Sequence, residues 1–313
     1  MRKFIVSDLH GNGEVYDSIM GYLDNIALVD DVELYINGDL IDRGLDGLRM
    51  LEDVKERIEG KGSIKINYLG GNHELMMYQA LMKRKPGKAI NHWSDWMNNG
   101  GWVIEGELDA RDDGEEKMEE LKYFLGNLDI YKKFGEVVAG NNILLVHAQA
   151  PKEVKDICDM KISDNNLAVD KAVWTRVEER DPLIFGIGKI IGYNRIGLDG
   201  YLTIVGHTPV KNYKGFKYND KDNYFNIDGG CAGYACGMFE EYDHVLLVEV
   251  EDGKLTLLTF NHNNEIINGY SYNGQLVKLN EDDLEKKKLF IDHTYDNCRE
   301  KSKQLIKEIL KDI

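Results

Sequence analysis

Apolar and polar positions follow two different spacings along the first third of the chain. Three segments rich in valine, isoleucine and tyrosine have the composition of strands, at residues 3–7, 32–37 and 64–69. Between them, residues 14–25 and 45–59 carry apolar side chains at the spacing of an amphipathic helix. Because strands linked through helices lie parallel, this order predicts a parallel sheet with right-handed crossovers.

Further strands are predicted in the second half of the chain, and the last of them lie close together. They cover residues 143–146, 202–205, 224–227, 245–250 and 255–259. Since only antiparallel neighbours can be joined by a tight turn, the short spacing predicts a mixed or antiparallel sheet here. Residues 75–127 have a mostly helical pattern, with a charged helix over 115–125. The whole pattern predicts an α/β fold.

The pattern changes after residue 262. The chain there is polar and rich in asparagine, and then strongly charged. Leu305, Ile306, Ile309 and Leu310 have helical spacing, which predicts a terminal amphipathic helix. We therefore expect a main domain over residues 1–262 and a C-terminal extension over residues 263–313 that is helical and packed on the core. A regulatory or dimerisation element is the alternative.

The composition is that of a folded globular protein. Of 313 residues, 42% are hydrophobic and 30% are charged, whereas disordered chains are poor in apolar residues. No apolar run reaches the ~18 residues of a membrane-spanning helix. Four cysteines in a chain of this length do not indicate a disulfide framework, and the first residues are too polar for a secretory signal. These features predict a cytoplasmic protein with no membrane partner.

The net charge limits the classes of partner. With 39 Lys and Arg against 55 Asp and Glu, the formal charge is −16. Such a surface disfavours nucleic acids as partners, since their binding needs positive side chains. Carboxylates can instead bind divalent cations, although most of them only solvate the surface.

Polar motifs follow several predicted strands, each at the carboxyl end of its strand. They are DLHGN at residues 8–12, GDLIDRG at 38–44, GNHE at 71–74, His147, and GHT at 206–208. Taken alone each is weak, because a lone histidine at a strand end is usually structural. Since loops beyond the carboxyl ends of strands meet at one crevice of an α/β sheet, the set predicts a shared site. Its mixture of Asp, Asn and His suits Mn, Fe or Zn better than Mg or Ca.

The first three motifs resemble the signature boxes of the phosphoprotein phosphatase (PPP-type) metallophosphoesterases. His147 and the motif at 206–208 match the two later histidines of that family, so the resemblance spans about residues 1–260. Trp96 with the NGG at 99–101, and Trp174 with Arg176, are similar to elements of bacterial serine/threonine protein phosphatases. The resemblance implies a four-layer α/β/β/α sandwich with two central mixed sheets, and makes residues 1–262 the catalytic domain.

A centre of two divalent metal ions is implied by the same resemblance. One ion would be held by Asp8, His10 and Asp39, and the other by Asp39, Asn72, His147 and His207. Asp39 would bridge the two ions, which we expect to be Mn, with Fe or Zn as alternatives. A hydroxide bridging the ions would attack phosphorus in line, with no covalent phosphoenzyme.

Catalytic and phosphate-binding roles also come from the resemblance. His73 would be the general acid that protonates the leaving oxygen, and Asp42 would orient its ring. A salt bridge to Arg43 is the alternative role for Asp42. Arg43 and Arg176 would bind the phosphoryl oxygens, a task that suits the forked guanidinium group. Arg176 could instead be a surface residue, and Arg195 is a weaker candidate of the same kind.

The expected function is hydrolysis of phosphomonoesters, with phosphoserine or phosphothreonine in proteins as substrates. The alternatives are a dinucleoside tetraphosphatase, an RNA-end phosphatase or phosphodiesterase, and a scaffold that has lost turnover. Asp42 favours a protein phosphatase, because related tetraphosphatases often depart from Asp there. The acidic net charge disfavours RNA. The scaffold is disfavoured because all six ligands are present, together with His73 and Arg43. The expected partner is therefore a phosphoprotein or a small phosphate ester.

Overall fold

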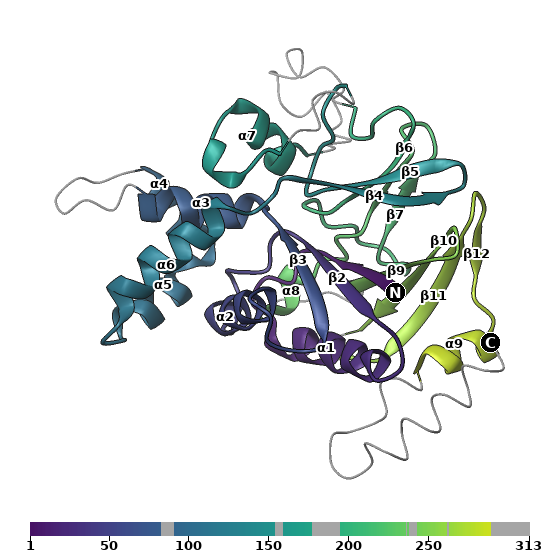
Figure 1. Cartoon of the computed structure of the whole chain (residues 1–313), viewed down its shortest axis with the longest axis horizontal. Coiled ribbons are helices and arrows are strands. Elements are labelled where there is room, and N and C mark those ends of the chain that lie inside the picture. Colours follow the sequence, from purple (N-terminus) through teal and green to yellow (C-terminus); the bar gives the residue numbers. More distant parts are fainter. Residues whose placement is uncertain are drawn as a thin grey trace, which may run out of the picture.

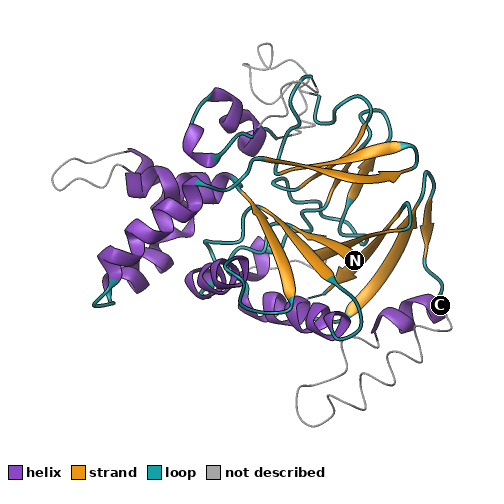
Figure 2. Cartoon of the chain, in the orientation of Figure 1, coloured by secondary structure: helices purple, strands orange, loops and turns teal. Residues whose placement is uncertain are grey.

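Two β-sheets with helices around them form the molecule, seen in a computed structural model (Figures 1 and 2). The structure describes residues 1–82, 91–153, 159–176, 195–235, 237, 243–261 and 263–288. Both sheets are mixed, which confirms the predicted fold class. Within the described residues, no helix is both long and apolar enough to cross a membrane.

The larger sheet has seven strands in the order β12-β11-β10-β9-β1-β2-β3. Its parallel half consists of β1 (Arg2–Val6), β2 (Val32–Asn37) and β3 (Ile64–Leu69). Its antiparallel half consists of β9 (Val245–Glu251), β10 (Lys254–Phe260), β11 (Ile266–Tyr272) and β12 (Leu276–Lys278). The two halves meet where β1 pairs with β9.

The smaller sheet has five strands in the order β4-β5-β6-β8-β7. They are β4 (Tyr131–Val138), β5 (Asn141–Val146), β6 (Tyr201–Val205), β7 (Lys217–Asn219) and β8 (Tyr224–Asn226). The three central strands run parallel, and the two outer strands pair with them antiparallel.

Helices connect the parallel strands and form a separate helical region after β3. The connecting helices are α1 (Gly13–Ala27) and α2 (Gly47–Ile58), and the helical region begins with α3 (Asn72–Met82). The helical region continues with α4 (Asn91–Trp96), the π-helical segment η1 (Met97–Gly101), α5 (Trp102–Asp109) and α6 (Gly114–Gly126). Shorter elements follow, namely η3 (Ile162–Asp164), α7 (Leu167–Trp174), α8 (Ala232–Ala235) and α9 (Glu281–Lys288).

Strand β1 shows how the two sheets are packed. It is apolar on both faces, as expected for a strand that is covered on both sides. Phe4 and Val6 pack into a core shared with the helices, whereas Ile5 packs into a second core. That second core also contains Leu145 of β5 and Ile204 of β6, so it lies between the sheets. The two sheets therefore pack directly against each other through this second core.

The predicted strands are all present, and the structure adds β4, β7, β11 and β12. Strands β10 and β11 pair with each other, so strand pairing crosses the boundary that we placed at residue 262. The separate C-terminal extension stays a prediction, and the terminal helix over residues 305–310 lies outside the described residues.

Candidate metal centre

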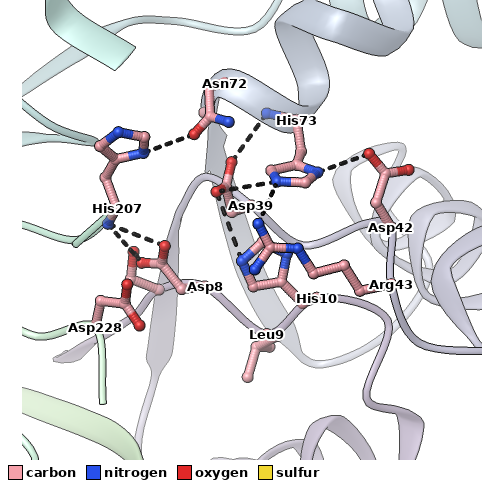
Figure 3. Close-up of polar contacts among 12 residues, drawn as sticks. Asp8, Leu9, His10, Asp39, Asp42, Arg43, Asn72, His73, His207 and Asp228 are labelled. Carbon is pink, nitrogen blue, oxygen red and sulfur yellow. Dashed lines mark hydrogen bonds and ion pairs between the residues drawn. The ribbon is translucent and has the colours of Figure 1, made fainter. Parts of the chain in front are cut away.

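The predicted ligands come from loops at the carboxyl ends of strands in both sheets, as expected. Asp8 and His10 follow β1, Asp39 follows β2, Asn72 begins α3 directly after β3, His147 follows β5, and His207 follows β6. All six are buried. Figure 3 shows the ring of His207, which follows a strand of the smaller sheet, directed at Asn72, and its backbone nitrogen next to Asp8. The structure therefore brings together residues up to 199 positions apart, such as Asp8 and His207.

Asp39 lies at the centre of this group. Its Oδ2 atom is 3.4 Å from Nε2 of His147, 3.7 Å from Nε2 of His10 and 3.9 Å from Nε2 of His73. Its Oδ1 atom accepts a hydrogen bond of 3.0 Å from the backbone N–H of His73. One carboxylate oxygen is thus fixed by the protein, while the other is surrounded by imidazole nitrogens.

A second set of contacts joins Asn72 to the later histidines. The Oδ1 atom of Asn72 is 2.7 Å from Nδ1 of His207 and 3.2 Å from Nε2 of His147. On the other side of its ring, Nδ1 of His147 lies 2.8 Å from the backbone carbonyl of Asn37, to which it donates. That bond selects the tautomer whose Nε2 lone pair faces Asp39, a common arrangement behind metal-binding histidines.

Two groups of potential ligand atoms share Asp39. One contains His10, Asp39 and His73, the other Asp39, His147 and His207, and the atoms of each group lie within 4.8 Å of one another. Asp8 lies beside these groups, where its carboxylate accepts hydrogen bonds from Ser7 and from the backbone N–H of His207. The two groups share Asp39 as predicted, but the first contains His73 where we expected Asp8, and the ligand role of Asp8 stays a prediction.

The electrostatics of the centre fit bound cations. Burial raises the pKa of Asp8 well above its usual range, and the nearby Asp228 raises it further. Burial and the neighbouring His73 lower the pKa of His10 well below its usual range. Burial would also raise the pKa of Asp39, but the surrounding imidazoles, His147 foremost, hold it well below the usual value. Burial would lower the pKa of His147, but Asp39 raises it to about 10, so this ring must lose a proton to bind a metal, whereas Asp39 is already in the ionised form that binds one.

The donor set around Asp39 suits divalent ions. It combines carboxylate oxygens with imidazole nitrogens, and all of these side chains are buried. Such a mixture of oxygen and nitrogen donors fits a pair of borderline divalent ions.

His73 and Asp42 form a buried pair beside the ligands. Nδ1 of His73 is 2.7 Å from Oδ2 of Asp42, and Arg43 does not replace it as the partner of this carboxylate. The Nη2 atom of Arg43 instead lies 3.3 Å from Nε2 of His73. Burial raises the pKa of Asp42, although its bond to His73 opposes the shift. The hydrogen bond by which we expected Asp42 to orient His73 is thus present, and among the described residues no ion pair joins Asp42 to Arg43.

The comparisons with known proteins agree with this geometry. Residues 1–294 match the sequence profile of the family described as calcineurin-like phosphoesterase. The chain belongs to this family. It is therefore a metallophosphoesterase, from a family of hydrolases that use divalent metal ions. A search of curated protein sequences returned no match.

Solved structures similar to this phosphoesterase come from proteins of several activities. A cold-active protein-tyrosine phosphatase of a psychrophilic Shewanella is 15% identical, with a TM-score of 0.44 over 89% of this chain and 80% of that one. A serine/threonine phosphatase from Saccharomyces cerevisiae is 12% identical, with a TM-score of 0.49 over 90% and 82%. A diadenosine tetraphosphatase, described as putative, is 14% identical, with a TM-score of 0.46 over 83% and 94%.

The loops of the phosphoesterase centre have unusual backbone geometry. Positive φ angles between 48° and 69° occur at Asp8, His10, Asp39, Asp42, Arg43 and His207. This left-handed region costs a residue with a side chain roughly 1–2 kcal/mol. Strained backbone of this kind clusters at functional sites, where the surrounding structure enforces it.

Glu74 is one residue that enforces this geometry, and we assigned it no role beyond its place in the GNHE motif. Its buried carboxylate accepts backbone N–H bonds of 2.8 Å from Asp39, 3.0 Å from Leu40 and 2.8 Å from Gly71. The hydroxyl of Tyr68 donates a further bond of 2.6 Å. Glu74 thus ties the loop after β2 to the start of α3.

Asp228 is a second residue that sequence reasoning did not place in the site. It is buried next to Asp8 (Figure 3), and burial raises its pKa to about 6. The backbone N–H of Gly230 donates a 2.9 Å bond to its Oδ1 atom. Asp228 follows β8, so the rule of polar residues at strand ends applies to it as well.

The two other predicted arginines, Arg176 and Arg195, are exposed. Arg176 is exposed after α7, and its charge contributes to the low pKa of His207, which burial and His147 bring to about 3. Its predicted contact with phosphate stays a prediction. Arg195 is also exposed and forms an ion pair with Asp199. The ring of Trp174 packs edge-to-face on His207, with 6.1 Å between the ring centroids.

Proposed function

We propose that this phosphoesterase hydrolyses phosphate monoesters, with phosphoserine and phosphothreonine in proteins as its substrates. The observation that carries the proposal is the buried Asp39 shared by two ligand groups, next to the His73–Asp42 pair and Arg43. Transfer of a phosphoryl group to water needs cationic charge to activate the water, an acid to protonate the leaving oxygen, and a donor such as guanidinium to bind the phosphoryl oxygens. These groups lie together here.

The metal ligands are those that the family resemblance implied. Asp8, His10 and Asp39 would hold one ion, and Asp39, Asn72, His147 and His207 the other. When bound, the two ions supply Lewis-acid charge and lower the pKa of the attacking water. We propose Mn as the metal, because the mixed donors suit a borderline ion.

His73 is assigned as the general acid on the basis of its two ring nitrogens. Nδ1 donates to Asp42, so Nε2 faces the region of Asp39 and Arg43, where a substrate phosphate would lie. Because Nη2 of Arg43 can only donate, Nε2 accepts from it in this arrangement. When Arg43 turns to a phosphoryl oxygen, Nε2 can carry the proton that passes to the leaving alkoxide, and Asp42 stabilises the positive ring before that transfer. Arg43 is positioned to bind a phosphoryl oxygen and to balance the charge that develops on it.

Metal and substrate dependence test the proposal together. The protein is freed of metal with a chelator and then given Mn, Mg, Zn or Ca, with a phosphoserine peptide, an aromatic phosphomonoester or a dinucleoside tetraphosphate as substrate. We expect Mn-dependent hydrolysis of both monoesters. Preference for the tetraphosphate would replace the substrate class, and no turnover with any metal would refute hydrolysis and favour a scaffold.

A substitution at His73 sharpens this experiment. His73→Asn is expected to lower kcat for the phosphoserine peptide by about 10²- to 10⁴-fold, the usual contribution of a general acid. His92→Asn is the matched control, because His92 lies on α4 outside the ligand groups. Equal effects of the two substitutions would contradict the assignment of His73.

A further inference from the structure

The carboxylate of Asp42 has two oxygens, and each is bonded to a different part of the molecule. Oδ2 bonds His73 at 2.7 Å, while Oδ1 accepts a 2.9 Å hydrogen bond from Nε1 of Trp96. The side chains of Asp42 and Trp96 are both fully buried. Since Trp96 lies at the end of α4, the helical region after β3 contacts the catalytic centre at this carboxylate.

Two glycines after Trp96 allow this arrangement. A Cβ atom at Gly101 would overlap the indole ring of Trp96, so the backbone packs directly on that ring. Gly100 has a φ of 102°, and a Cβ there would lie 2.5 Å from the backbone nitrogen of Arg43. The segment 96–101 therefore packs closely against the loop that carries both Asp42 and Arg43.

The bond from Trp96 has a mechanical consequence for His73. A carboxylate with one partner can rotate about its Cβ–Cγ bond, whereas one with a donor on each oxygen is fixed. If the indole N–H were absent, Oδ1 would be buried without this donor, which is costly. Asp42 would then hold the ring of His73 less firmly. The effect of Trp96 on His73 therefore passes through Asp42, which is bonded to both residues.

We propose that Trp96 is a positioning residue for the acid of this phosphoesterase, and that Gly100 and Gly101 hold it in place. Trp96 acts through Asp42 on His73, and the glycines let the same segment support Arg43. The inference rests on the proposed function, because it takes His73 as the proton donor.

Replacing the indole N–H tests the proposal through the leaving group. Trp96→Phe keeps an aromatic ring and removes the donor. With Mn added, we expect kcat for a phosphoserine peptide to fall by about 10-fold or more, a part of the usual contribution of a general acid. For p-nitrophenyl phosphate, whose leaving group needs little protonation, we expect less than about a 3-fold change. KM should change little for either substrate.

Trp93→Phe is the matched control on the same helix. The Nε1 atom of Trp93 also donates to a carboxylate, at 3.3 Å from Oε1 of Glu105, but Trp93 is exposed and does not bond Asp42. We expect this variant to show no difference between the two substrates. A loss of the same size for both substrates in Trp96→Phe would mean that Trp96 is only structural, and would overturn the proposal.

A second variant covers the case in which Trp96→Phe does not fold, and a double-mutant cycle adds an independent test. Gly101→Ala keeps the tryptophan but displaces its ring, and we expect the same dependence on the leaving group. Adding Trp96→Phe to Asp42→Ala should cost little more than Asp42→Ala alone, because the partner of the indole is already gone. Additive losses would overturn the proposal.

A measurement on the metal-free protein separates this inference from the proposed function. The indole N–H signal of Trp96, identified by its absence in Trp96→Phe, should exchange with solvent faster in Asp42→Ala than in the unchanged protein. An unaltered exchange rate would refute the bond. If the unchanged protein hydrolyses no phosphate ester, the proposed function fails, whatever this measurement gives.

Discussion

The two halves of the seven-stranded sheet use buried charges in different ways. In the parallel half, β1, β2 and β3 end in loops that carry Asp8, Asp39 and Asn72 toward one point. In the antiparallel half, the buried Glu249 of β9 is bonded at 2.7 Å to Nε of Arg2 and at 2.5 Å to Nζ of Lys287. The residues after the strands of the parallel half bring candidate ligand atoms together, whereas the buried charge of Glu249 is neutralised within the chain.

This contrast explains why the halves affect different properties. Like charges held together in the first half cost stability and provide a binding site. Opposite charges in the second half satisfy one another and join β1, β9 and α9. We therefore expect substitutions in the first half to change activity and substitutions in the second half to change the free energy of unfolding.

The largest expected effect is at Asp39. Asp39→Asn removes the charge shared by both ligand groups. Loss of a residue that only hydrogen-bonds a metal ligand costs up to about 100-fold in activity, so we expect loss of this shared carboxylate to lower kcat by at least about 100-fold. Bound metal, measured by elemental analysis after Mn loading, should fall as well. Activity close to that of the unchanged protein would contradict the view that the parallel half of the sheet carries the catalytic centre.

The next effect is at Glu249. Glu249→Gln leaves Arg2 and Lys287 without their carboxylate, and we expect a loss of about 3 kcal/mol in the free energy of unfolding, as when one partner of a buried pair is removed. The kcat of the folded protein should not change. Glu251→Gln is the matched control. Glu251 is only partly buried and lies 3.9 Å from Nε of Arg2, so the loss of stability should stay below about 1 kcal/mol. If urea unfolding gave equal losses of stability for Glu249→Gln and Glu251→Gln, burial of the ion pair would not be the cause of the loss at Glu249.

The smallest effect is the pH dependence of the same pair. Burial opposes ionisation of Glu249, but Lys287 and Arg2 lower its pKa below the ordinary value of 4.5. Its contribution is therefore fully present above pH 4.5 and is lost as the pH falls through the lower pKa of the folded state. The difference in unfolding free energy between the unchanged protein and Glu249→Gln should shrink below this pH. A constant difference would contradict the lowered pKa.

The same contrast shows what the sequence can predict. The residues that we propose as ligands lie at the ends of central strands, where we expected them, because buried strands are continuous apolar runs and polar residues after them stand out. Three of the strands that we did not predict, β4, β7 and β12, lie at sheet edges. Edge strands are covered on fewer sides and carry charged residues such as Lys132 and Lys133, which hide their pattern.

Residues that position other side chains or loops were harder to predict than the proposed ligands. Glu74 lies in a recognised motif, but its role depends on backbone N–H groups from two loops, which sequence spacing does not reveal. Trp96 meets Asp42 from 54 positions away, through a helix whose packing depends on two glycines. Asp228 follows a strand and could have been found by the rule that found the others.

The left-handed residues of the metal centre also bear on how this protein tolerates mutation. Six residues at roughly 1 kcal/mol each store a free energy comparable with the ~5–15 kcal/mol net stability of an ordinary domain. Glycine would relieve that strain at Arg43, whose φ is 69°, while removing the guanidinium group. A search for thermostable variants made without a test of turnover would therefore select such inactive glycines. The loops that give this protein its chemistry are also the part of its sequence where stability and activity are most directly opposed.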